Sequence, residues 1–332
     1  ITALVLGLTM LYFFLAIGPT AADQASDYMF NSGNRSSQTD EEDDWSLADE
    51  ELIGPNGEYI SAIEIGTIFD PDGAAIPSAA NLTPSDKPEV SLNFAAPADA
   101  IRLHRSGQIY VTSFTHSFFD GLRWTTPNAE SKILTPSPDG LIHLRQSDQP
   151  PTFRYSVFHG RLSDGQNTVK TLQGAQNVRL LGITKFTDGT WLLPERHSGY
   201  FNYEAASSPK MFENLTNSPI SAGTANPVYR AAPSHGDLRG RVQMLAGQFR
   251  GTTSITESLT SLQNHLRENY RYALALKYPV NGKTALENFL DNSNTATNSG
   301  FCVHFASAAA LVARELDVPS RICYGWRGGQ FF

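Results

Sequence analysis

The sequence of 332 residues contains only two cysteines, Cys302 and Cys323. So few cysteines exclude a disulfide-rich scaffold and a zinc site built from four cysteines. The eight histidines are scattered and show no HExxH spacing, so the sequence carries no recognised metal-binding motif. We therefore expect neither a metal nor a cofactor. A disulfide between the two cysteines is kept as an alternative, because an oxidising compartment would permit it.

A basic stripe is also lacking. The formal net charge is −8, with 25 Lys and Arg against 33 Asp and Glu. Eight of these acids lie in residues 40–51, and the rest of the chain is balanced at 25 of each sign. The balance argues against a nucleic-acid partner. The acidic run itself is typical of a solvated linker.

A long apolar run occupies residues 1–17, and no charged residue appears before Asp23. Its length matches that of a membrane-spanning helix, which Pro19 would end. The first basic residue after it is Arg35, so the positive-inside rule places the following domain outside the cytoplasm. We expect a transmembrane segment at residues 1–19 in the lipid bilayer, with the bulk of the chain periplasmic or on the cell surface. A cleaved signal peptide is the alternative, although its basic n-region is missing.

Composition divides the remaining chain into three parts. Residues 20–85 are rich in Ser, Asp, Asn and Gly, which predicts an acidic, flexible tether. Residues 86–235 hold short β-branched and aromatic runs separated by Asp-Gly pairs, which predicts a β-rich, β-sandwich-like domain. The expected strands are residues 90–94, 109–114, 152–158 and 178–183, and the Asp-Gly turns begin at Asp120, Asp139, Asp164 and Asp188.

From about residue 236 the apolar residues recur at helical spacing, so residues 236–332 are predicted to form an α+β domain. Two capping boxes, each a Ser or Thr followed three residues later by Glu, mark helix starts. They are Ser254–Glu257 and Thr284–Glu287. A third helix begins near Cys302 and ends before Pro319, and residues 320–325 predict a strand. The whole chain is therefore assigned to the α+β class.

Cys302 lies where the predicted loop becomes the third helix. Unpaired backbone N–H groups and the positive end of the helix dipole favour a thiolate at that position. Cys302 is thus the candidate catalytic residue, with a purely structural thiol as the alternative. Cys323 lies inside a predicted strand, where a cysteine is expected to fill the core. His304 is two residues from Cys302 and so points to another helical face, which favours a packing role.

Several motifs around Cys302 resemble the first half of the transglutaminase-like core. They are residues 300–308, Arg314, residues 318–321 and residues 325–329, with Ser320 and Trp326 as mild departures. Upstream, Asp120-Gly121-Leu122-Arg123-Trp124, Tyr270-Arg271-Tyr272 and residues 285–290 resemble motifs of a bacterial, membrane-anchored group of the TgpA type. The specific part of the resemblance covers about residues 265–332, and we expect the chain to stop within that core.

The resemblance implies a papain-like Cys-His-Asp mechanism in which Cys302 attacks a carboxamide, such as a Gln side chain of a protein or peptide substrate. The acyl-enzyme would pass to an amine or to water, as an acyltransferase or a peptidase. The base would be a His on a later strand, but the sequence has no His after His304. We therefore expect these 332 residues to be inactive alone. The alternative is a non-catalytic module that binds peptides or cell-envelope material.

Overall fold

We describe the fold from a computed structural model. It describes residues 52–53, 59–60, 73–81, 90–105, 109–126, 130–145, 150–162, 167–195, 199–208, 227–233, 236–250, 254–291 and 298–327. The predicted membrane segment at residues 1–19 and most of the predicted tether at residues 20–85 lie outside these ranges. No helix in the described ranges is long and apolar enough to cross a membrane.

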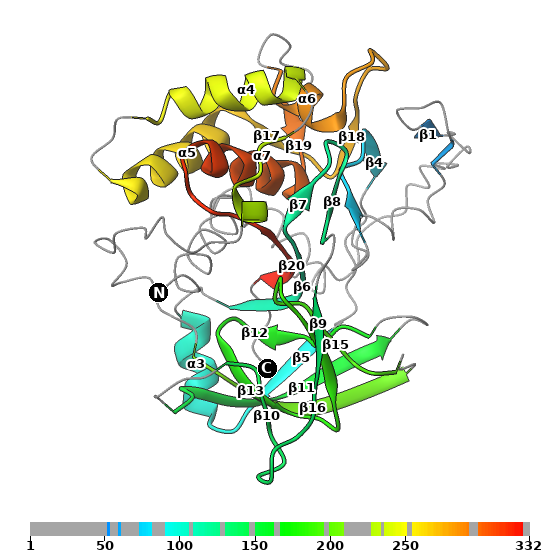
Figure 1. The fold of residues 1–332 in the computed structure, drawn as a ribbon, viewed down its shortest axis with the longest axis vertical. Coiled ribbons are helices and arrows are strands. Elements are labelled where there is room, and N and C mark those ends of the chain that lie inside the picture. The colour runs from blue at the N-terminus through cyan, green and yellow to red at the C-terminus, as the bar shows by residue number, and fades with distance from the viewer. Residues whose placement is uncertain are drawn as a thin grey trace, which may run out of the picture. The chain divides into compact units, whose positions relative to one another are not determined.

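The described residues group into two compact units, each assembled from separate stretches of the chain (Figure 1). Unit 1 draws on the described residues within 1–86, 117–125 and 220–322, and unit 2 on those within 87–116, 126–219 and 323–332. The four short strands before residue 86 are β1 (Leu52–Ile53), β2 (Tyr59–Ile60), β3 (Ala74–Ala75) and β4 (Ala79–Asn81). The division at residues 20–85, 86–235 and 236–332 stays a prediction.

Unit 2 is built on antiparallel sheets. The five-stranded sheet has the order β10 (Ile142–His143), β13 (Ala175–Arg179), β16 (Gly199–Ser207), β11 (Phe153–Leu162) and β5 (Val90–Phe94). In its centre, Val157 of β11 is opposite both Tyr203 of β16 and Leu92 of β5. Alternate residues of β11, from Phe153 to His159, are buried, as expected when one face of a sheet covers a core.

Two three-stranded sheets complete the unit. One has the order β12 (Thr171–Leu172), β6 (Tyr110–His116) and β20 (Ile322–Arg327). The other has the order β15 (Trp191–Leu192), β14 (Ile183–Phe186) and β9 (Ser131–Leu134). The predicted strands at residues 90–94, 109–114 and 152–158 are confirmed to within a few residues by β5, β6 and β11.

Two predictions for the β-rich region are wrong. The run 178–183 is not one strand, because β13 ends at Arg179 and β14 begins at Ile183, with Leu181 97% exposed between them. A helix, α3 (Pro97–Arg105), also lies where only strands were expected. Pro97 suits the first position of a helix, and fully buried Leu103 joins α3 to the core of unit 2.

The Asp-Gly turns are confirmed where the structure describes them. The glycines after Asp120, Asp139 and Asp188 have φ angles of 112°, 76° and 98°, a region that favours glycine. The fourth pair, at Asp164, lies outside the described residues. The turn at Asp120 joins β7 (Phe118–Phe119) to β8 (Arg123–Thr125), and the two strands form a hairpin of unit 1.

Unit 1 holds the helices, and α7 (Cys302–Glu315) is its central element. It packs against α4 (Gly236–Gly247), α5 (Ile255–Asn269), α6 (Ala285–Phe289) and the short 3-10 helix η4 (Pro227–Arg230) (Figure 1). Its residues Val303–Phe305 and Ser307–Arg314 are buried. The predicted helix starts are confirmed, because Ser254 caps α5 and Thr284 forms a complete capping box with Glu287 at α6.

Short strands surround the first turn of α7. Strand β17 (Arg271–Tyr272) pairs in parallel with β19 (Ser299–Gly300), which leads directly into the helix. Strand β18 (Ala275–Lys277) pairs antiparallel with β4. The β17–β19 pair fixes the chain just before Cys302.

Candidate functional site

The first residue of α7 is Cys302, as the sequence predicts. Gly300, two residues earlier, allows the chain to approach closely here. A Cβ atom on Gly300 would lie 2.8 Å from the His304 Cβ and 2.9 Å from the Phe289 ring. Any larger residue would therefore displace the segment that carries the thiol.

Three hydrogen-bond donors converge on the Cys302 thiol. They are its own backbone N–H, the N–H of Val303 and the hydroxyl of Tyr272. Tyr272 lies opposite Gly300 in the parallel β17–β19 pair, and its ring centroid is 6.0 Å from that of Phe305 in α7. The Tyr272 hydroxyl also accepts a hydrogen bond from the Cys302 N–H.

The expectation that this helix start favours a thiolate is not met. The side chain of Cys302 is partly exposed by its accessible surface, but it is enclosed by protein atoms. This burial raises the pKa of Cys302 from 9.0 to about 11, against the opposing effect of the three donors. At pH 7 only about one thiol in 10,000 would then be ionised. Desolvation of the charged sulfur outweighs the local N–H groups.

His304 does not supply a base. It is fully buried, and burial lowers its pKa to about 4, so the ring is neutral near pH 7. Its Nε2–H donates to the carbonyl oxygen of Pro77 at 3.1 Å, and its ring packs edge-on against Phe301 at 4.7 Å. The predicted packing role is confirmed. In the described part of the chain, no histidine or carboxylate contributes to the pKa of Cys302.

The other end of α7 holds a buried guanidinium. Arg314 is 4% exposed and donates to the carbonyl oxygens of Ala231 at 2.9 Å, Ser117 at 2.6 Å and Ser320 at 2.8 Å. Its Nε also donates to the Ser320 hydroxyl at 3.2 Å. Burial lowers the pKa of Arg314 to about 10, so the group stays charged at neutral pH. Arg314 thus ties α7 to the segments before and after it.

Trp124 connects the β7–β8 hairpin to the same cluster. Its ring lies 5.0 Å from the Arg314 guanidinium carbon, and its indole N–H donates to the Ser307 hydroxyl at 2.8 Å. Asp120 shapes the preceding turn by accepting the backbone N–H groups of Leu122 and Arg123. The motif residues Trp124, Arg314 and Ser320 therefore form one structural cluster beside the C-terminal part of α7.

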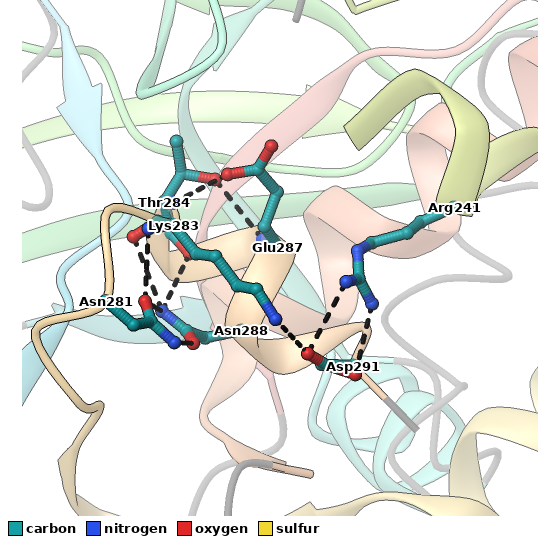
Figure 2. A network of polar contacts seen from close by, with 7 residues as sticks. All are labelled: Arg241, Asn281, Lys283, Thr284, Glu287, Asn288 and Asp291. Atoms are coloured by element: carbon teal, nitrogen blue, oxygen red, sulfur yellow. Dashed lines mark hydrogen bonds and ion pairs between the residues drawn. The ribbon is translucent and has the colours of Figure 1, made fainter. Parts of the chain in front are cut away.

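A second polar network surrounds the short helix α6 (Figure 2). Asp291, just after α6, accepts hydrogen bonds from Lys283 and Arg241, the latter forming an ion pair at 3.2 Å. Nearby, Thr284 and Glu287 form the capping box of α6, with hydrogen bonds of 2.7 and 3.2 Å. The network attaches the end of α6 to α4.

Cys323 lies in β20 as predicted, but it is half-buried, whereas its neighbours Ile322 and Tyr324 are buried. Both cysteines are free thiols, so the disulfide alternative is wrong. Gly325 follows, where a Cβ would lie 1.9 Å from the carbonyl oxygen of Val111. Within unit 2, the Lys170 ammonium lies 4.5 Å from the Trp326 ring centroid.

Sequence reasoning singled out Tyr272 only as part of a motif and gave it no role. Its partner Cys302 is 30 residues further along the chain, so no local pattern joins the two. The described residues contain no cluster of three or more His, Cys, Asp or Glu able to hold a metal ion.

Comparisons with known proteins show which sequences and folds resemble this chain. Residues 243–331 match the model of the transglutaminase-like superfamily. Over 229 residues the chain is 27% identical to a protein-glutamine gamma-glutamyltransferase of Pseudomonas aeruginosa, a match that covers 67% of this chain and 30% of that protein. The chain thus spans about a third of that relative's length.

The fold also resembles a solved structure. The crystal structure of the periplasmic domain of TgpA from Pseudomonas aeruginosa matches with a TM-score of 0.53 at 24% sequence identity. The match covers 75% of this chain and 77% of that domain. The matched family model spans α5, α6, Cys302, Arg314 and β20. The region 243–331 is therefore similar in sequence to the transglutaminase-like superfamily.

Proposed function

We propose that this chain is part of a thiol enzyme in which Cys302 forms an acyl-enzyme with a carboxamide. The observation that carries the proposal is the convergence of two backbone N–H groups and the Tyr272 hydroxyl on the Cys302 thiol. These donors are arranged where negative charge would develop on sulfur, and we propose that they also act on the attacked carbonyl oxygen. Such preorganised donors stabilise an oxyanion.

The chemistry follows from these groups. The Cys302 sulfur attacks the amide carbon, and its proton passes through a base to the leaving nitrogen, which departs as ammonia. The resulting thioester transfers its acyl group to an amine or to water. Within the described residues no imidazole faces the thiol. We propose that the base is a His outside the described residues, which as an imidazolium would lower the pKa of Cys302.

The relatives support the substrate class and the location. The sequence relative is a protein-glutamine gamma-glutamyltransferase, so the acyl donor we propose is a Gln side chain of a protein or peptide. The structural relative is a periplasmic domain, which agrees with an extracytoplasmic position for this chain. Residues 1–19 would anchor it in the lipid bilayer, because their apolar run has the length of a membrane span.

The test follows two products on the intact, membrane-anchored protein. Ammonia release and incorporation of a fluorescent primary amine are measured with a Gln-containing peptide. We expect both signals to disappear in Cys302→Ser and to persist in Cys323→Ser, the matched thiol control. Equal activity in wild type and Cys302→Ser would overturn the proposal.

The raised pKa of Cys302 favours a second candidate, a non-catalytic module that binds peptides or cell-envelope material. A binding module needs no thiolate. The same two variants separate the candidates: a binder would hold its peptide equally well with Ser at position 302 and would release no ammonia at all.

A further inference from the structure

A cavity of about 570 Å³ opens in unit 1 beside β17. It lies among the last turn of α5, strands β17 and β18, and the residues that enter β19. Its lining includes Glu268, Arg271, Leu276, Lys277, Tyr278 and Ser299. Neither Cys302 nor Tyr272 lines it, so it is distinct from the immediate surroundings of the thiol.

The cavity is nevertheless linked to the thiol through the β17–β19 pair. Arg271 is opposite Ser299, and Tyr272 is opposite Gly300. Successive side chains of a strand point to opposite faces, so Arg271 lines the cavity while Tyr272 reaches Cys302. Three Cα–Cα steps separate Ser299 from Cys302, which limits their separation to about 11 Å.

The charges around the cavity are unequal. Arg271 and Lys277 are both exposed, and neither forms an ion pair with another described residue. Glu268 is the one acid among the lining residues. Two lining residues are held together, because the hydroxyl of buried Tyr278 donates a hydrogen bond to the Ser299 carbonyl oxygen at 2.6 Å. The result is a preformed recess with an excess of positive charge.

We propose that this cavity is a subsite for an acidic side chain of an extended polypeptide whose Gln side chain reaches Cys302. The inference rests on the proposed acyl transfer at Cys302. An extended peptide advances about 3.4 Å per residue, so an upper limit of about 11 Å corresponds to about three residues at most. The preferred substrate therefore carries Asp or Glu up to three positions from the reactive Gln.

Binding tests the subsite without turnover, on the 332-residue chain with Cys302→Ala. Fluorescence anisotropy is measured with labelled peptides that carry Gln and, three positions away on either side, Glu or Lys. We expect one of the two Glu peptides, the one whose acid reaches the cavity, to bind about fivefold more tightly than its Lys counterpart. The double variant Arg271→Glu/Lys277→Glu should reverse that preference. Lys132→Glu, an exposed charge reversal on β9 of unit 2, is the matched control and should leave it unchanged.

If the chain with Arg271 and Lys277 intact bound the Glu and Lys peptides with equal affinity, the proposed subsite would be wrong. It would also be wrong if the double variant lost affinity for both peptides to the same extent. Turnover by the intact protein separates the two proposals. Ammonia release without any charge preference would contradict the subsite alone. A charge preference in binding, without Cys302-dependent ammonia release, would contradict the proposed function alone.

Discussion

The two ends of α7 each enclose an ionisable group, but the guanidinium at one end stays charged and the thiol at the other stays neutral. At its C-terminal end, the Arg314 guanidinium donates four hydrogen bonds to carbonyl and hydroxyl oxygens. At its N-terminal end, the Cys302 thiol receives three donors but no positive charge from the described residues. Burial disfavours the charged form at both ends. Burial lowers the pKa of Arg314 to about 10, so the guanidinium stays charged at pH 7. It raises the pKa of Cys302 to about 11, so the thiol stays protonated at pH 7.

The difference shows what each end is built to do. A charged group whose hydrogen bonds are all made within the fold holds segments together. A thiol held among donors, yet neutral at pH 7, would need another group before it could act as a nucleophile. One helix therefore joins a structural cluster to a site that remains incomplete within the described residues.

The largest effect is expected from breaking the structural end. Arg314→Ala would leave the carbonyl oxygens of Ser117, Ala231 and Ser320 buried without their donor. We expect the free energy of unfolding to fall by about 3 kcal/mol, because each unpaired buried polar group costs 1–3 kcal/mol. Urea unfolding monitored by circular dichroism measures it.

Arg239→Ala is the matched control, because Arg239 is an exposed arginine of α4. Its unfolding midpoint should stay close to that of the unchanged protein. If Arg314→Ala cost no more than Arg239→Ala, the cluster behind α7 would have no structural role.

A smaller effect is expected at Gly300, where the chain is tightly packed just before the N-terminal end of α7. Gly300→Ala would place a Cβ 2.8–2.9 Å from His304 and the Phe289 ring. Overpacking of this kind costs about 1–3 kcal/mol, and the loop before Cys302 must shift. We expect a lower unfolding midpoint together with altered thiol accessibility. Gly240→Ala, on the open surface of α4, controls for the loss of glycine and should not destabilise the protein.

The smallest effect is expected at the network of Figure 2. Asp291→Asn keeps the shape of the side chain but removes the charge that pairs with Arg241 and Lys283. The pairs are partly exposed, so we expect a loss of about 1 kcal/mol that shrinks in high salt. Denaturant curves at two salt concentrations measure it, with Glu195→Gln in unit 2 as the exposed control. A loss that is unchanged by salt would show that the charge contributes nothing.

Local signals made three helices of unit 1 predictable, whereas α4 and η4 were not predicted. Ser254 and Thr284 cap α5 and α6 as their spacing indicates, and the apolar stripe fixes α7. Short-range patterns were less reliable in unit 2, where a run of apolar residues concealed the exposed turn at Leu181. Helix α3 was missed because strand signals surround it.

The chemistry of the site was only partly predictable. The position of Cys302 follows from the local sequence, but its pKa depends on how deeply the folded chain encloses it. The contact of Tyr272 with Cys302 and that of Trp124 with Ser307 join residues 30 and 183 positions apart. Such contacts are set by the fold and not by any local pattern.

The central claim is that Cys302 is positioned as a nucleophile but not activated by the described residues. It is tested most directly by the pH dependence of alkylation of Cys302 by iodoacetamide, followed by mass spectrometry of the 332-residue chain carrying Cys323→Ala. Because the thiolate is the reactive form, the rate should rise with pH to a midpoint near 11. A midpoint below the free-thiol value of about 8.5 would show an activated thiolate and contradict the claim.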